Sequence, residues 1–108
     1  MGSTKKEQYL PYQLRYAQLS DAMGHPARIA ILEHMNIYFR ANSLELIHLT
    51  KLSKSTVSQH IKELLDSKLL FERFEDDSNI HYYYLNPHAG DMRKEVVSHV
   101  FKRNLFET

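Results

Sequence analysis

Residues 53–67 hold the largest set of side chains that could do chemistry. If this segment is a helix, successive side chains are about 100° apart, so Val57, Ile61, Leu64 and Leu65 share one sector that must be buried. Ser53 is placed to cap the helix start, because its hydroxyl can accept a first-turn N–H. The side chains left outside are polar and can donate or accept hydrogen bonds: Lys54, Ser55, Thr56, Ser58, Gln59, Lys62 and Asp66.

Such a polar helix face suits the edges of base pairs in double-stranded DNA. Gln59 can pair with an adenine edge, and serine and threonine hydroxyls can bond either a donor or an acceptor. Lys54 and Lys62 can neutralise phosphates, and His60 is a further candidate for a phosphate contact. A solvated helix face is the alternative interpretation, so the surrounding elements must decide between the two.

The elements before this segment predict a helix-turn-helix over residues 43–67. A first helix is expected over residues 5–23, with Pro11 at its start or at a kink and Gly24 after its end. A short second helix opens at His25–Pro26, with Ile29, Leu32 and Met35 buried. After a connection at 37–41, Asn42 and Glu45 predict a capped third helix over 43–51, with Leu46 and Leu49 inward. The turn before Ser53 is so short that the third and fourth helices must cross steeply.

A β-hairpin, or wing, is predicted over residues 69–85. Residues 69–74 and 80–85 are rich in aromatic and β-branched side chains, and a polar turn separates them. Arg73 is the expected wing contact to the DNA backbone, whereas Glu75, Asp76 and Asp77 would repel phosphate at the tip. Side chains alternate along a strand, so we expect at least one of Tyr82, Tyr83 and Tyr84 to pack on the core rather than all to stack on bases.

A last helix, over residues 88–105, is expected to pair with the first across a dimer. It begins at Asn86–Pro87 or at Asp91 and carries a broad apolar stripe. A domain of this size has little reason to expose such a stripe unless a partner covers it. The expected dimerisation residues of the two terminal helices are Leu10, Leu14, Met92, Val96, Val100 and Phe101.

Composition narrows the class of protein further. The 108 residues predict one domain, and 14 Lys and Arg against 13 Asp and Glu give a net charge of only +1. Any DNA affinity must therefore come from local placement of charge. The absence of cysteine excludes disulfides, thiolate metal sites and cysteine nucleophiles. No membrane span, signal peptide or enzyme motif is seen, so we expect a cytoplasmic protein that is not an enzyme and needs no cofactor.

Three segments of the chain resemble the ArsR-type repressors. Residues 22–32 (AMGHPARIAIL) resemble the opening signature of that family, residues 52–64 (LSKSTVSQHIKEL) its recognition helix, and residues 82–85 (YYYL) the end of its wing. The resemblance implies a mainly α fold of about five helices with a small β-hairpin, the winged helix-turn-helix. It also implies a homodimer that places two recognition helices in successive major grooves of an inverted-repeat operator and responds to an effector or a metal.

The sequence departs from that family where metal sensors carry ligands. The third helix has no cysteine pair, and His88 and His99 lack the acidic residues that would complete a zinc site between the final helices. We therefore expect no metal, and a histidine-based zinc-responsive repressor stays an alternative. The acidic wing and the low net charge leave a second alternative, a winged-helix protein-interaction module that does not read DNA.

Overall fold

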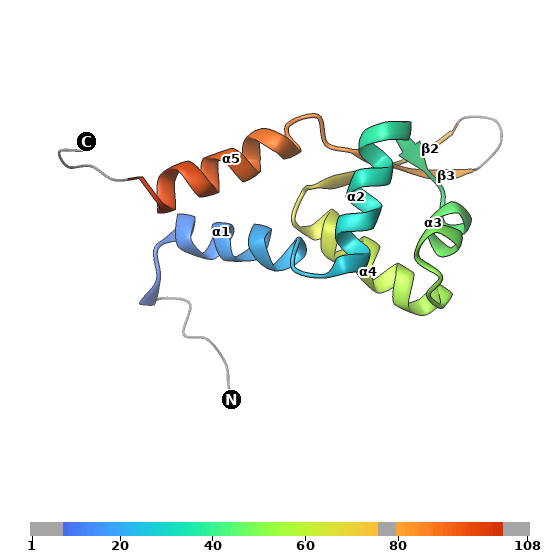
Figure 1. The fold of residues 1–108 in the computed structure, drawn as a ribbon, viewed down its shortest axis with the longest axis horizontal. Helices are drawn as coiled ribbons and strands as arrows, with labels where there is room; N and C mark the ends of the chain where they lie inside the picture. Colours follow the sequence, from blue (N-terminus) through green and yellow to red (C-terminus); the bar gives the residue numbers. More distant parts are fainter. Residues whose placement is uncertain (1–7, 76–79, 103–108) are drawn as a thin grey trace.

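The computed structural model describes residues 8–75 and 80–102. Its elements are α1 (Pro11–Ala22), α2 (Pro26–Tyr38), β1 (Arg40–Ala41), α3 (Ser43–Thr50), α4 (Lys54–Asp66), β2 (Leu70–Phe74), β3 (His81–Leu85) and α5 (Ala89–Val100). The molecule is elongated, with extents of 55 × 37 × 26 Å. The helices α1 and α5 lie together at one end, and the hairpin projects from the other (Figure 1).

The first two helices begin at prolines. Pro11 opens α1, where its missing N–H costs nothing, and the Leu10 N–H is bonded by the Gln13 side chain at 2.9 Å. The sequence predicted that this helix begins at residue 5. This prediction is wrong over residues 8–10, which are not α-helical, whereas residues 5–7 lie outside the described part of the chain. Pro26 opens α2, and the His25 ring caps it by accepting the Ala27 N–H at 3.0 Å.

The second helix differs from the sequence prediction in length and in its buried face. It runs for 13 residues to Tyr38, so residues 37 and 38 are not part of a connecting segment. Its buried side chains are Ile31 and Met35, which lie four residues apart on one face, whereas Ile29 is 41% exposed. The helix is therefore rotated relative to the stripe expected from the spacing of residues 29, 32 and 35.

The sheet has three antiparallel strands in the order β1–β3–β2. Leu70 pairs with Leu85 and Phe74 with His81, which confirms the predicted hairpin, while the short β1 strand was not foreseen. Alternation along β3 buries Tyr83 against the core and leaves Tyr82 and Tyr84 partly exposed on the other face. The expectation that one tyrosine packs inward is confirmed.

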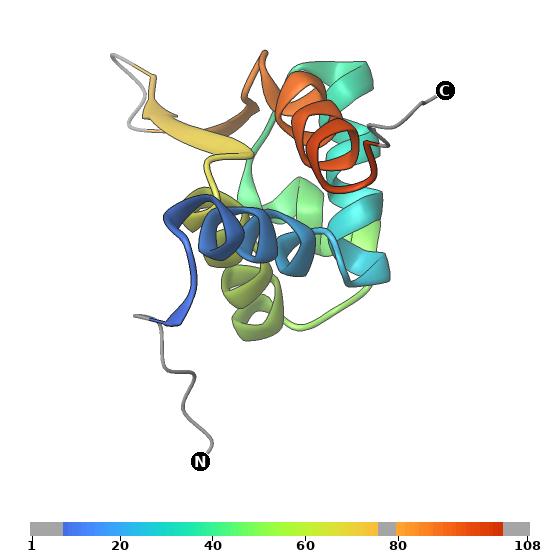
Figure 2. The same cartoon turned by 90° about the vertical axis from the view of Figure 1, so that its left-hand side faces the viewer.

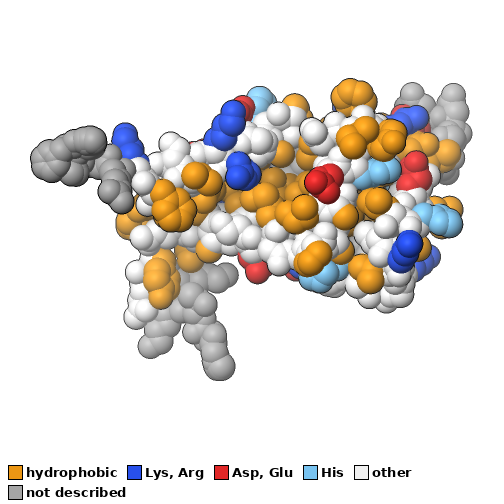
Figure 3. Space-filling view, in the orientation of Figure 1, with side chains coloured by type: hydrophobic (Ala, Val, Ile, Leu, Met, Phe, Trp, Pro, Cys, Tyr) orange, Lys and Arg blue, Asp and Glu red, His pale blue; other side chains and the backbone are white. Residues whose placement is uncertain are grey.

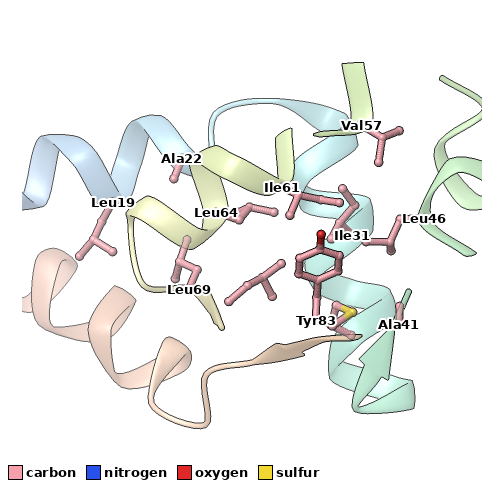
Figure 4. Packing of buried hydrophobic residues seen from close by; sticks show 12 residues of the cluster. Leu19, Ala22, Ile31, Ala41, Leu46, Val57, Ile61, Leu64, Leu69 and Tyr83 are labelled. Carbon is pink, nitrogen blue, oxygen red and sulfur yellow. The ribbon is translucent and has the colours of Figure 1, made fainter. Parts of the chain in front are cut away.

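One hydrophobic core joins all the helices except α5, together with the sheet. In Figure 4 the Tyr83 ring lies among Ile31 of α2 and Ile61 and Leu64 of α4. The core residues are Leu19, Ala22, Ile31, Met35, Ala41, Leu46, Val57, Ile61, Leu64, Leu69, Leu70 and Tyr83. No residue of α5 is buried. Its Met92 and Val96 are partly buried and pack against this core.

Candidate nucleic-acid interface

The helices α3 and α4 form a tight helix-turn-helix whose ends are fixed by side-chain caps. Asn42 accepts the Glu45 N–H at 3.0 Å and Glu45 accepts the Asn42 N–H at 2.8 Å, which is the predicted reciprocal capping box. Lys51 ends α3 in the left-handed region with φ 60°, and Ser53 caps α4 by accepting the Thr56 N–H at 3.3 Å. Three residues thus suffice to redirect the chain from one helix into the next.

The buried and exposed faces of α4 are set by the spacing of its apolar residues. Val57, Ile61 and Leu64 are buried in the core, as predicted, and Leu65 is half-buried. The opposite face is exposed, and an open surface hollow there is lined by Ser53, Lys54, Ser55, Ser58, Gln59 and Lys62. The structure therefore brings together on one surface five of the eight residues expected to bind DNA: Lys54, Ser55, Ser58, Gln59 and Lys62. Thr56 is also exposed, but it does not line the hollow.

The exposed side chains of α4 differ in what they already bind. Within the described part of the chain, the side chains of Ser58 and Gln59 make no hydrogen bond, so both can bond an incoming group. Lys62 donates to Asp66 one turn later at 2.8 Å, and this hydrogen bond raises the pKa of the lysine. Both partners are well exposed, so the pair is weak and a phosphate can compete for Lys62.

His60 does not lie on this exposed face. Its side chain is only 6% exposed, and its Nδ1 accepts a hydrogen bond from Arg28 Nε at 3.0 Å. The prediction of a phosphate contact by His60 is therefore wrong. The α4 face buries positions 57, 60, 61 and 64, so a histidine at 60 belongs to the buried set by its spacing, but the position of Arg28 on α2 gave no signal in the sequence.

The wing places Arg73 on the strand β2, where it is exposed and does not line the α4 hollow. Its guanidinium lies 5.9 Å and 5.8 Å from the ring centres of Phe71 and Tyr84. Glu75 forms an ion pair with Arg40 of β1, which fixes one acidic residue of the wing to the body of the protein. Asp76 and Asp77 lie outside the described residues, so the predicted acidic tip is described only at Glu75.

The α1–α5 end carries exposed apolar side chains that face away from the core. Figure 2 shows the two helices from this end, and Figure 3 shows hydrophobic side chains at the surface of the same end in the orientation of Figure 1. Of the predicted dimerisation residues, Leu10 and Val100 are each 54% exposed and Phe101 is 74% exposed, while Leu14, Met92 and Val96 are half-buried. We call the exposed set the terminal patch: Tyr9, Leu10, Tyr12, Val97, Val100 and Phe101.

The two histidines weighed as zinc ligands occupy different surroundings. His88 precedes the first residue of α5, whereas His99 Nδ1 lies 3.0 Å from the Tyr16 hydroxyl and its ring stacks on Tyr12. The Tyr16 hydroxyl donates to Glu95 at 3.0 Å, so His99 donates to the tyrosine oxygen. Among residues 8–75 and 80–102, no group of three potential ligands is close enough to hold a metal ion.

Comparison with solved structures relates this geometry to transcriptional regulators. The transcriptional repressor PagR of Bacillus anthracis is 28% identical, with a TM-score of 0.62 over 79% of this chain and 95% of PagR. An ArsR family transcriptional regulator has a TM-score of 0.71 at 15% identity, over 89% of this chain and all of the other. NolR from Sinorhizobium fredii has a TM-score of 0.65 at 20% identity, over 96% of this chain and 99% of NolR. No protein-family model and no curated protein matches the sequence.

These similarities define the class of fold. The chain is a winged helix-turn-helix protein, with five helices and a three-stranded antiparallel sheet among residues 8–75 and 80–102. Its fold is that of the ArsR-type transcriptional regulators, so the resemblance carried by residues 22–32, 52–64 and 82–85 is confirmed at the level of the fold. No helix in the described part of the chain is long and apolar enough to span a membrane.

Proposed function

We propose that this protein is a sequence-specific DNA-binding repressor of transcription that acts as a homodimer in the cytoplasm. The observation that carries the proposal is the polar face of α4, whose side chains are exposed while the rest of the helix is anchored in the core. In this role Gln59, Ser55 and Ser58 contact base edges in the major groove, and Lys54 and Lys62 contact phosphates. Thr56 and, from the wing, Arg73 supply further contacts.

The first turn of α4 adds a second source of affinity for DNA. The Ser53 hydroxyl bonds the Thr56 N–H and the Ser53 carbonyl bonds the Val57 N–H, and the N-terminus of a helix favours an adjacent anion. Lys54 stands at the same place. A phosphate bound at the N-terminus of α4 would fix the position of this helix along the DNA. Gln59, five residues after Lys54, would then face a defined base pair.

Dimerisation through the terminal patch would give the two recognition helices a two-fold relation. The patch combines aromatic and aliphatic side chains from α1 and α5, and a second copy of the same surface would remove them from water. A two-fold helix-turn-helix dimer reads half-sites about one helical turn of DNA apart. The operator is therefore expected to be an inverted repeat of that spacing, and release of the protein by an effector would relieve repression.

The proposal is tested by selecting binding sites from a random double-stranded DNA library with the purified full-length chain. The expected result is an inverted repeat bound with an affinity that falls steeply with salt, because each neutralised phosphate releases counterions. Sedimentation of the complex should give two protein chains per site. Binding that is indifferent to both sequence and salt would reject a sequence-specific repressor and favour the interaction module.

A further inference from the structure

A cluster of one buried and two more accessible side chains ties the recognition helix to the corner between α1 and α2. His60 of α4 accepts a hydrogen bond at Nδ1 from Arg28 Nε of α2, at 3.0 Å. The ring of His25, the cap of α2, lies 4.3 Å from the His60 ring, centre to centre. Arg28 also donates through Nη1 to the Asp21 carbonyl at 3.0 Å, at the end of α1. We call His25, Arg28 and His60 the corner cluster; it joins three helices where they meet (Figure 1).

Both histidines of the corner cluster act as acceptors at Nδ1. His60 accepts from Arg28, and His25 accepts from the Ala27 N–H at 3.0 Å. A guanidinium and a backbone N–H can only donate, so in each ring Nδ1 is unprotonated and the neutral form carries its proton on Nε2. A doubly protonated imidazole has no acceptor. Protonation of either ring therefore breaks the hydrogen bond that it makes.

We infer that the corner cluster positions the recognition helix for DNA and releases it when the pH falls, so that acid weakens operator binding. This inference rests on the proposed DNA-binding function. The Arg28–His60 bond is a side-chain hydrogen bond that holds α4 from behind its DNA-facing side. When it breaks, a cationic ring faces the Arg28 guanidinium, and the two like charges push α4 away from the corner.

The charges around His60 favour its neutral form. Burial lowers the pKa of His60, and the neighbouring His25 and Arg28 lower it further, while Glu63 on α4 opposes them. Asp21 meets the cluster through its backbone carbonyl. A folded-state pKa below the unfolded value of about 6.5 means that the stabilisation is complete above that pH and is lost as the pH falls toward the folded-state value.

The expected loss of DNA affinity in acid has the opposite sign to the change that general charge attraction between protein and DNA would cause. A protein gains positive charge in acid, which on its own strengthens the attraction to DNA phosphates. The corner cluster predicts the opposite trend. Each hydrogen bond lost is worth about a fivefold change in affinity, by the usual net strength of such bonds.

The decisive experiment measures operator affinity from about pH 7.5 to about pH 5.5 at constant ionic strength, around the ordinary histidine pKa. The wild-type chain should lose affinity by about fivefold or more in acid. The double variant His25→Asn with His60→Asn keeps a side-chain oxygen close to each Nδ1 position but cannot be protonated. It should bind like the wild type at neutral pH and lose the acid dependence. His48→Asn, on the exposed face of α3, is the matched control and should keep the wild-type pH profile.

Wild-type affinity that is constant or rises in acid, or an acid loss that survives in the double variant, would overturn the inference. If the double variant does not fold, His25→Asn alone decides, since asparagine is a favoured helix cap and this variant should lose part of the acid dependence. NMR titration of the His60 ring in the DNA-free protein provides a separate test, with a pKa below the ordinary histidine value expected. If no DNA binds at any pH, the proposed function fails, and the inference of acid-weakened operator binding fails with it. The NMR titration would still show whether the cluster holds His60 neutral.

Discussion

Replacement of Gln59 by alanine should relax the sequence specificity of DNA binding without changing its dependence on salt. The side chain lies on the exposed face of α4 and makes no hydrogen bond within the described part of the chain, so its loss leaves the fold intact. A bidentate contact to a base edge is worth about 1–3 kcal/mol of discrimination. Since about 1.4 kcal/mol is tenfold, affinity for the selected operator should fall by between about fivefold and about 150-fold.

The assay for this prediction is fluorescence anisotropy with the selected operator and with a scrambled duplex, each over a series of salt concentrations. Gln59→Ala should weaken operator binding and leave binding to the scrambled duplex unchanged, because a base contact carries no part of the phosphate attraction. Lys54→Gln should do the reverse: it lowers the affinity for both duplexes and reduces the slope of log affinity against log salt by about 0.9 for each lost phosphate contact.

A matched control is Asn36→Ala, which removes an exposed amide from α2. It should leave both affinities unchanged. The reasoning would be refuted if Gln59→Ala bound the operator as tightly as the wild type, or if it weakened the operator and the scrambled duplex equally. The first outcome would mean that α4 does not read bases at residue 59, and the second that Gln59 contributes only to general affinity.

Three further changes test other parts of the structure. Asp66→Asn should free Lys62 and raise DNA affinity by a few-fold at low salt, with no gain at high salt, as measured by the same anisotropy series. Val97→Glu should place a charge in the terminal patch and shift the protein from dimer to monomer in sedimentation equilibrium, whereas Ser98→Glu on the same helix should not; dimers of unchanged stability would refute the role of the patch. Leu64→Ala should lower the free energy of unfolding by about 2–5 kcal/mol in urea denaturation, because the side chain is completely buried, and a loss below about 1 kcal/mol would show that the site is not packed as described.

Some features could be predicted from the sequence because neighbouring residues decide them. Pro26 and Ser53 mark the starts of α2 and α4, and Asn42 with Glu45 marks the start of α3, since each cap bonds a backbone group within three residues. The inward face of α4 follows in the same way from the spacing of its aliphatic residues. The hairpin and the inward tyrosine follow from strand alternation and the polar turn.

The errors lie where distant parts of the chain decide. The sequence makes His60 a candidate for a phosphate contact, but its ring is buried and accepts a hydrogen bond from Arg28, which lies thirty-two positions away in the chain. The rotation of α2, which buries Ile31 rather than Ile29, follows from how that helix meets α3, α4 and the sheet. The two-residue strand β1 exists only because β3 lies beside it to supply hydrogen bonds.

The sequence by itself determined the order of the helices and the hairpin, the starts of α2, α3 and α4, and the polar face of α4, because local hydrogen bonds and residue spacing are properties of short segments. The tertiary structure alone supplied the Arg28 donor that pairs with the buried His60 ring. It also brought His25, Arg28 and His60 together and left the terminal patch uncovered. Those outcomes depend on which surfaces meet after folding, and burial of a polar group is favourable only once its partner from another element is in place.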